Sequence, residues 1–346
     1  TRYRFVTGVQ TCALPILEGT KIASVGTEPP EGTFDRVVDG AGKVLLPGFV
    51  NAHTHLPMTL MRGYGGGCDL HTWLNQYIFP AEARLDSRAV AAGAGLGLAE
   101  MIASGVTCVA DMYMHTGTIA EQILEAGISA NLSCGGVYFG APEDFSPETC
   151  GDCRNQAALT EEWHGAGAGQ ILVDASVHGE YTSNPPLWRW MAEYAAEHRL
   201  GMHVHVSETQ SEHQASLERW GKTPIQALDG CGVWDCGRSL AAHCVYTTEE
   251  DWALMAEKGI SCVHNPWSNL KLGSGVAPIP AMMRAGVNVA LGTDGMSSHN
   301  SADLFSDIKL AAVLHNGVER DPMAVNAWAA LEMATVNGAR ALGRDR

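Results

Sequence analysis

The sequence predicts an α/β protein: a distorted (β/α)8 barrel of the TIM type with a small, incomplete β-sandwich domain. From about residue 44 onward, short runs rich in Val, Ile and small residues alternate with longer Ala- and Glu-rich segments of helical period. This alternation is typical of repeated β-α units that form a parallel sheet. Eight such units within roughly 250 residues match the usual size of the barrel, whose functional residues follow the carboxyl ends of the strands.

Residues 17–43 precede the barrel and lack its pattern. The segments LEGTKIASVG and FDRVVDGAGK are short and β-like with no helical segment between them, which indicates part of a small β-sandwich domain. The first sixteen residues, TRYRFVTGVQTCALPI, do not continue into an obvious paired strand. Because they resemble the translated read-through of a sequencing adapter, we interpret residues 1–16 as a non-native leader. Residues 44–346 then form the barrel.

Eight barrel strands are predicted. They are residues 44–52, 105–111, 128–133, 171–177, 200–206, 239–243, 260–264 and 287–292. Segments between them, such as SRAVAAGAGLGLAEMIASG and PPLWRWMAEYAAEHRLG, carry helix-start residues and end at glycine.

Composition narrows the class of protein. The 46% hydrophobic and 17% charged residues are typical of a compact globular chain. A formal charge of -16 argues against a nucleic-acid-binding surface, which needs clustered Lys and Arg. We find neither an apolar run of the roughly 18 residues that a membrane helix needs nor a signal peptide, so we expect a cytoplasmic protein. The ten cysteines include one C-x-x-C, Cys150 and Cys153, without a second pair at zinc-ribbon spacing.

Two histidines, His53 and His55, stand at the carboxyl end of the first predicted strand. Residues i and i+2 of a strand point to the same side, so both imidazoles face one way. Taken alone, the pair fits two buried, hydrogen-bonded histidines as well as it fits a metal chelate.

Later strand ends add further ligand types. The fifth strand ends in MHVHVSET, with His203, His205 and Glu208, the sixth contributes His243, and the eighth is followed by Asp294. Three or four N/O ligands with an open position are what a catalytic divalent metal needs. His203 and His205 share a face, so spacing alone does not choose between them; the later position of His205 favours it.

The stretches PGFVNAHTHLPMTLMRG, WLNQYIFPAEARL, MHVHVSET, HNPWSNLKLGSGVAPIPAMMRAGVNVALGTDG and LEMATVNGARALG resemble the amidohydrolase superfamily. Within it they are most similar to the methylthioadenosine/S-adenosylhomocysteine deaminases and their chlorohydrolase relatives. The resemblance covers roughly residues 18–346.

The resemblance implies roles for individual residues. The implied metal ligands are His53, His55, His205 and Asp294; the implied catalytic residues are Glu208, His243 and Asp294; Trp73, Glu82 and His178 would contact the substrate. The fourth strand ends in ASVHGEY without the lysine of binuclear relatives, which favours one ion, zinc or iron(II).

The substrate-contacting residues have structural alternatives. Glu82 can accept two hydrogen bonds from a ribose diol, or it can be a solvated or helix-capping carboxylate. Trp73 can pack on the base or thioether, or belong to the core. Ser298 is expected either to position substrate near the metal or to cap its own loop.

The implied activity is hydrolytic deamination of the adenine ring of a 5'-modified adenosine: methylthioadenosine, S-adenosylhomocysteine or adenosine. Asp294 would accept a proton from water and Glu208 would donate one to the ring nitrogen, while His243 would hold the attacking oxygen. The alternatives are a related enzyme acting on guanine, cytosine, pterin or a triazine, and an inactive truncated homologue. The expected partner is a small nucleoside or purine-like substrate, without nucleic acid or membrane; a homo-oligomer is expected by analogy.

The chain departs from the resemblance in three places. Cys134 stands after the third strand where relatives that act on S-adenosylhomocysteine carry arginine, and only Arg154 is available nearby. HGEY replaces the more usual HAPY and places Glu180 near the expected pocket mouth. The chain also stops at Arg346, where relatives continue into further sandwich strands, so we expect the sandwich to lack its C-terminal strands.

Overall fold

The computed structural model describes residues 2–6, 14–19, 21–28, 31–40 and 42–345. The chain divides into two compact units, Thr1–Pro47 and Gly48–Arg346. The predicted boundary at residues 43 and 44 therefore lies close to the observed one.

The first unit contains a four-stranded sheet in the order β3-β2-β1-β4. Its strands are β1 (Arg2–Val6), β2 (Leu14–Glu18), β3 (Lys21–Gly26) and β4 (Arg36–Asp39). β1 pairs antiparallel with β2 and parallel with β4. The expectation that the first sixteen residues contribute no paired strand is therefore wrong, because strand pairing depends on partners that the local pattern does not show. The interpretation of residues 1–16 as a non-native leader stays a prediction.

The second unit is a barrel of parallel strands, as predicted. Its strands are β5 (Phe49–His55), β6 (Val106–Met112), β7 (Ser129–Ser133), β8 (Ile171–Gly179), β9 (Gly201–Val206), β10 (Ser239–His243), β11 (Ile260–His264), β12 (Val289–Leu291) and β13 (Asp294–Gly295). The sheet order is β12-β11-β10-β9-β8-β7-β6-β5-β13. β12 and β13 follow each other along the chain, and they pair with β11 and β5 respectively. One stretch of chain thus joins both ends of the sheet and closes the ring.

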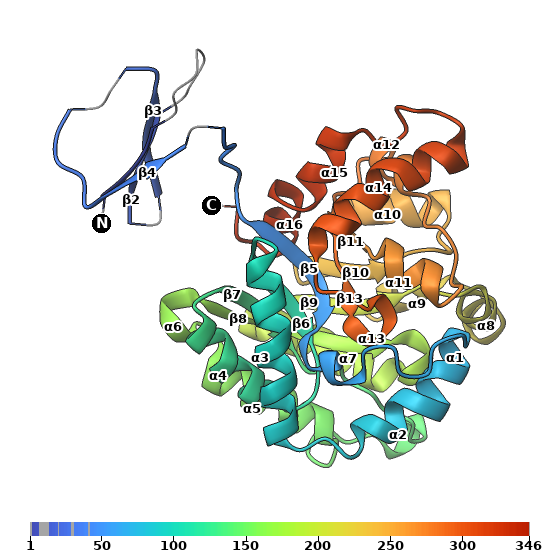
Figure 1. Ribbon diagram of the computed structural model, residues 1–346. Helices are drawn as coiled ribbons and strands as arrows, with labels where there is room; N and C mark the ends of the chain where they lie inside the picture. The colour runs from blue at the N-terminus through green and yellow to red at the C-terminus, as the bar shows by residue number, and fades with distance from the viewer. Residues whose placement is uncertain (1, 7–13, 20, 29–30, 41, 346) are drawn as a thin grey trace. The chain divides into compact units, whose positions relative to one another are not determined.

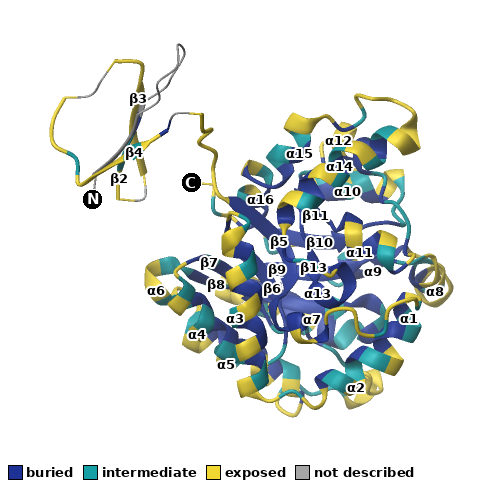
Figure 2. Cartoon of the chain, viewed as in Figure 1, coloured by how far each residue is buried: buried dark blue, intermediate teal, exposed yellow. Residues whose placement is uncertain are grey.

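The helices surround this ring (Figure 1). The described helices are α1 (Leu70–Trp73), α2 (Phe79–Glu82), α3 (Ser87–Ala103), α4 (Thr116–Ala126), α5 (Gly151–Trp163), α6 (Ala166–Gly169), α7 (Pro185–His198), α8 (Gln210–Trp220), α9 (Pro224–Asp229), α10 (Glu249–Lys258), α11 (Pro266–Lys271), α12 (Ile279–Arg284), α13 (Met296–His299), α14 (Leu304–Glu319), α15 (Ala327–Met333) and α16 (Val336–Ala341). Figure 2 shows buried strands inside and helices with exposed outer faces around them. This arrangement explains why the strands are nearly continuous apolar runs: they are covered on both faces.

The first barrel strand is shifted from its predicted position. β5 begins at Phe49 and continues through His55, whereas the prediction covered residues 44–52. Pro47 lacks the N–H that a strand ladder needs, and Val44 is 82% exposed. The shift brings both histidines into the strand itself.

A glycine separates β12 from β13 at the point where the barrel closes. A Cβ added at Gly292 would lie 2.8 Å from the backbone oxygen of His53. Only a residue without a side chain allows the two backbones to approach so closely. Gly292 therefore lets Asp294 reach the end of β5.

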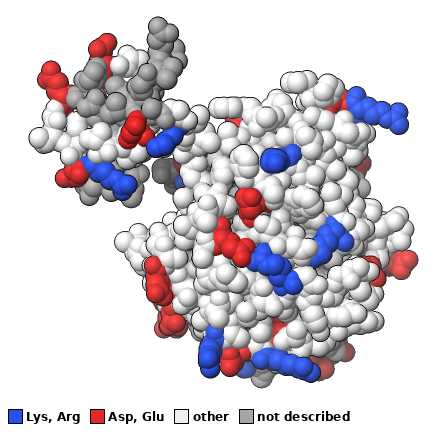
Figure 3. All heavy atoms as spheres, in the orientation of Figure 1, with Lys and Arg blue, Asp and Glu red and all other residues white. Residues whose placement is uncertain are grey.

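The surface of the molecule carries charges of both signs. On the face shown in Figure 3, Lys and Arg side chains are scattered among Asp and Glu side chains. Within the described parts of the chain, we find no helix with the length and apolar character required to cross a bilayer.

Candidate metal centre and active site

Four predicted ligands meet inside the carboxyl end of the barrel. The Nε2 atom of His55 lies 3.3 Å from Nε2 of His205 and 3.1 Å from Oδ1 of Asp294. The Nε2 atom of His53 lies 3.3 Å from the same Asp294 oxygen. Strands β5, β9 and β13 thus contribute to one group of ligand atoms.

The hydrogen bonds behind two of these histidines set their orientation. Nδ1 of His55 lies 2.5 Å from the backbone oxygen of Met112, and Nδ1 of His205 lies 2.6 Å from that of His178. A carbonyl oxygen only accepts hydrogen bonds, so each Nδ1 carries the proton. The Nε2 atom of each ring therefore faces the centre, which is the arrangement of a metal-binding histidine.

His53 completes the centre, and its contact with His203 shows which of the two histidines on β9 faces away from the centre. Its Nδ1 lies 2.9 Å from Nε2 of His203, which places His203 behind His53. Its Nε2 is buried and has no hydrogen-bond partner, and burial lowers the pKa of His53 to about 4. This buried nitrogen without a partner is what a bound cation would satisfy.

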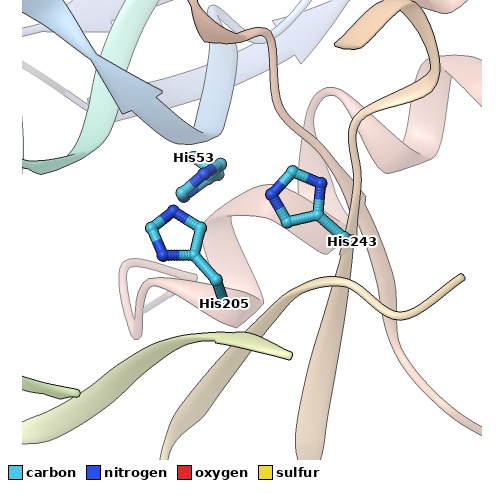
Figure 4. A group of neighbouring side chains, drawn as sticks. All are labelled: His53, His205 and His243. Atoms are coloured by element: carbon cyan, nitrogen blue, oxygen red, sulfur yellow. The ribbon is translucent and has the colours of Figure 1, made fainter. Parts of the chain in front are cut away.

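Two groups of ligand atoms satisfy the geometry of a metal site. In each group the atoms lie within 4.8 Å of one another: His53, His55 and Asp294 form one, and His53, His205 and His243 form the other. Figure 4 shows the rings of His53, His205 and His243 pointing toward a common centre. The residues present therefore fit a divalent cation bound by nitrogen and oxygen.

Asp294 is held in a fixed orientation. The hydroxyls of Ser268 and Ser298 donate to its Oδ2 at 2.5 and 2.9 Å, which leaves Oδ1 facing the histidines. Burial alone would raise the pKa of Asp294, but the neighbouring imidazoles of His53 and His55 hold it well below its usual value. Asp294 is therefore ionised, as a metal ligand requires.

Ser298 holds the carboxylate of Asp294 and does not line the cavity. Its hydroxyl is also within 2.9 Å of the Gly295 carbonyl, and Ser298 is not among the residues that line the cavity. This position favours orientation of Asp294 over the expected contact with substrate.

Glu208 and His243 lie on the opposite side of the centre from β5. Oε2 of Glu208 is 3.7 Å from Nε2 of His243, and the Ser274 hydroxyl donates to Oε1 at 3.1 Å. Burial raises the pKa of Glu208. Nδ1 of His243 lies 2.8 Å from Oδ1 of Asn269. The site thus combines a carboxyl group inclined to hold a proton with an imidazole whose Nε2 faces the centre.

Glu212 was missed by the sequence analysis. Its two carboxylate oxygens accept the backbone N–H groups of Ser207 and Glu208, both at 2.7 Å. Ser207 has a φ of 54°, a left-handed conformation that such bonds stabilise. The spacing of Thr209 and Glu212 at the start of α8 was the available signal, because it matches a capping box. In a capping box the glutamate returns to the cap residue, whereas here it reaches the two residues before it.

A cavity of about 430 Å³ opens onto the centre. Trp73, Glu82 and His178 line it together with His55, His205, Glu208, His243 and Asp294, so the cavity brings the predicted substrate residues to the predicted ligands. Burial raises the pKa of Glu82 and lowers that of His178 to about 4. The size suits a small organic ligand.

Arg154 and Glu180 both lie away from the cavity. Arg154 donates to the Glu148 carbonyl at 2.8 Å. Glu180 is fully buried and binds Arg219 at 2.6 Å and the indole of Trp220 at 2.5 Å. Glu180 is not among the residues that line the cavity, although its neighbour Tyr181 is, and its charge fixes the end of α8 against the end of β8.

Comparison with known proteins agrees with this geometry. Residues 44–346 match the model of the Amidohydrolase family. The chain is 40% identical over 329 residues to a 5-methylthioadenosine/S-adenosylhomocysteine deaminase of Syntrophomonas wolfei, covering 95% of this chain and 75% of that protein. It is 41% identical over 330 residues to a 5'-deoxyadenosine deaminase of Methanothermobacter thermautotrophicus, covering 95% and 76%.

Solved structures share the fold. An adenosine deaminase of Xanthomonas campestris with bound zinc is 32% identical, with a TM-score of 0.88 over 99% of this chain and 80% of the other. A guanine deaminase of C. acetobutylicum, at 22% identity and a TM-score of 0.87 over 99% and 85%, shows similarity of fold alone. With the family match and the relatives each covering most of the sequence, the chain belongs to the amidohydrolase family.

Proposed function

We propose that this protein is a metal-dependent hydrolytic deaminase that converts the adenine ring of a 5'-modified adenosine to hypoxanthine and releases ammonia. One observation carries the proposal. Three residues of the buried His/Asp centre line one cavity together with the carboxyl groups of Glu208 and Glu82: they are His55, His205 and Asp294. The names of the relatives in Syntrophomonas wolfei and Methanothermobacter thermautotrophicus support the substrate class.

His53, His55, His205 and Asp294 would hold one divalent ion, for which we propose zinc. The zinc in the Xanthomonas campestris structure supports this choice. When bound, such an ion lowers the pKa of water toward neutrality and so supplies a nucleophile without a strong free base. β8 contributes the His178 carbonyl to hold His205 and has no lysine, which supports one ion over two.

The chain's own residues handle the protons. Asp294 would accept the proton of the attacking water at Oδ1, while Ser268 and Ser298 hold Oδ2. Glu208, whose pKa burial raises, would donate a proton to the ring nitrogen, and the carbon that bears the amine then becomes more electrophilic. His243 would hold the attacking oxygen through Nε2.

Measurement of ammonia release tests the proposal. Purified, zinc-loaded protein would be incubated with methylthioadenosine, S-adenosylhomocysteine, adenosine, guanine and cytosine. We expect ammonia from at least one adenine nucleoside and none from the free bases. Ammonia from guanine or cytosine, with silence on every nucleoside, would refute the proposal in favour of a base deaminase.

Glu82 is predicted to bind the ribose. Glu82→Gln replaces a buried acceptor that can take two hydrogen bonds from a vicinal diol, so kcat/KM for the nucleoside should fall about 10- to 100-fold. Steady-state ammonia release from the nucleoside and from its 2',3'-dideoxy analogue provides the check. For the dideoxy analogue, which has no diol to bind, kcat/KM of the variant should lie close to that of the wild type. Glu125→Gln, an exposed change on α4, is the matched control.

Glu212 is predicted to position Glu208. Glu212→Ala removes both acceptors of the Ser207–Glu208 backbone, so kcat should fall about 10- to 100-fold with little change in KM. Glu212→Gln keeps one oxygen and should recover part of the loss. Glu218→Ala, on the exposed face of α8, is the control and should match the wild type. An equal fall of activity in the Glu218 variant would indicate damage to the helix and contradict the positioning role.

A further inference from the structure

One end of the cavity lies away from the reacting groups. It is formed by Cys134, Val137 and Phe139, which follow β7, and by Asp152 in the first turn of α5. We call these four residues the distal end. In the closed ring β7 stands across from β11, so it lies on the side away from β10 and β13, which carry His243 and Asp294. A nucleoside whose base is at the centre would direct its other end here.

The distal end has no positive charge. Among the described residues that line the cavity there is neither lysine nor arginine. Burial raises the pKa of the Cys134 thiol to about 12, so it is neutral. A negatively charged ligand group would meet no cation here.

One acidic group is present instead. Oδ2 of Asp152 accepts the backbone N–H of Val137 at 2.8 Å, and Oδ1 accepts the side-chain amide of Asn155 at 3.3 Å. Burial raises the pKa of Asp152, and these two bonds, which favour the carboxylate, offset only part of that rise. Two like charges brought together in a partly desolvated site repel strongly.

We propose that the distal end accepts an uncharged or cationic substituent on the 5' carbon and rejects an α-amino-acid carboxylate. The inference rests on the proposed function for the orientation of the nucleoside. A carboxylate at this end would lose water, gain no cation and face Asp152. A methylthio or alkyl group would instead pack on Val137 and Phe139 at no such cost.

The sharpest test compares ligands that differ in one group. Methylthioadenosine, S-adenosylhomocysteine and decarboxylated S-adenosylhomocysteine would be titrated into the zinc-loaded Glu208→Gln protein, which should consume them at least about 100-fold more slowly than the wild type. We expect methylthioadenosine and the decarboxylated ligand to bind at least about 30-fold more tightly than S-adenosylhomocysteine. Binding of S-adenosylhomocysteine within about threefold of its decarboxylated form would overturn the inference, as would failure of all three to bind.

Turnover by the wild-type protein separates this inference from the proposed function. The expected order of affinities without ammonia from any nucleoside would refute the deaminase activity and leave the selectivity of the cavity standing. Ammonia from S-adenosylhomocysteine with a kcat/KM equal to that for methylthioadenosine would support the activity and overturn the selectivity.

Two substitutions assign the effect to the distal end. Asp152→Asn removes the charge while its amide oxygen still accepts the Val137 N–H. The affinity for S-adenosylhomocysteine, relative to that for its decarboxylated form, should therefore rise about 5- to 10-fold. Cys134→Arg supplies a cation and should raise this relative affinity further. Glu143→Gln removes a negative charge from the same loop outside the cavity and should leave the ratio of affinities unchanged. An unchanged ratio in Asp152→Asn, or an equal change in Glu143→Gln, would overturn the role of Asp152.

Discussion

Asp294→Asn is expected to reduce kcat by about 10³-fold or more, the largest loss that we predict for a single isosteric change. Asp294 holds two positions at once: its Oδ1 faces His53 and His55, and its Oδ2 is held by two serine hydroxyls. An amide at this position cannot accept the proton of the attacking water. The change in shape is minimal, so the loss reports the missing base and the missing negative charge.

Metal content distinguishes these two contributions. Three histidines remain in the Asn variant, and we expect about one zinc ion per chain after purification in zinc-replete medium, with weaker retention against a chelator. Asp303→Asn is the matched control, because Asp303 caps α14 outside the cavity and asparagine caps equally well. Turnover of the Asp294 variant within tenfold of the wild type would refute its role as the proton acceptor.

Ser268→Ala and Ser298→Ala offer a graded form of the same test. Each serine donates one hydrogen bond to Oδ2, so each loss should allow the carboxylate some rotation away from the centre. These variants should retain more activity than Asp294→Asn, because the base itself is still present.

Much of the fold was predictable because a closed parallel barrel repeats one local pattern. β10 and β11 were predicted with their observed bounds, since both are short apolar runs between clear turn residues. β5 was misplaced because Val44 and Leu45 look like strand residues, yet they lie exposed before Pro47. The pairing of β1 was missed because it depends on β2 and β4, which lie elsewhere in the sequence.

The site was predictable where its residues stand at the carboxyl ends of parallel strands. His53, His55 and Asp294 meet as expected, because parallel strands bring their carboxyl ends together. His203 and His205 could not be separated by the two-residue period. The structure distinguishes them, because His203 lies behind His53 whereas Nε2 of His205 faces Nε2 of His55. Glu212 escaped notice because its role depends on the left-handed turn at Ser207, which the sequence does not display.

Glu208→Gln is expected to lower kcat by about 10²- to 10⁴-fold while leaving KM and zinc content close to those of the wild type. The glutamine oxygen can still accept the Ser274 hydroxyl, so the side chain keeps its place and only the transferable proton is lost. Burial already raises the pKa of Glu208, so folding opposes the charged form that the Gln variant lacks. The variant should therefore fold with an unfolding midpoint no lower than that of the wild type.

The pH dependence of kcat gives a second readout for Glu208. A general acid acts only while protonated, so wild-type kcat should fall as the pH rises through the raised pKa of Glu208. The Gln variant should lack this alkaline fall, because it has no proton to lose. If kcat of the variant lies within fivefold of the wild type and shows the same alkaline fall, another group donates the proton. His243, 3.7 Å from Glu208, would then be the next residue to substitute.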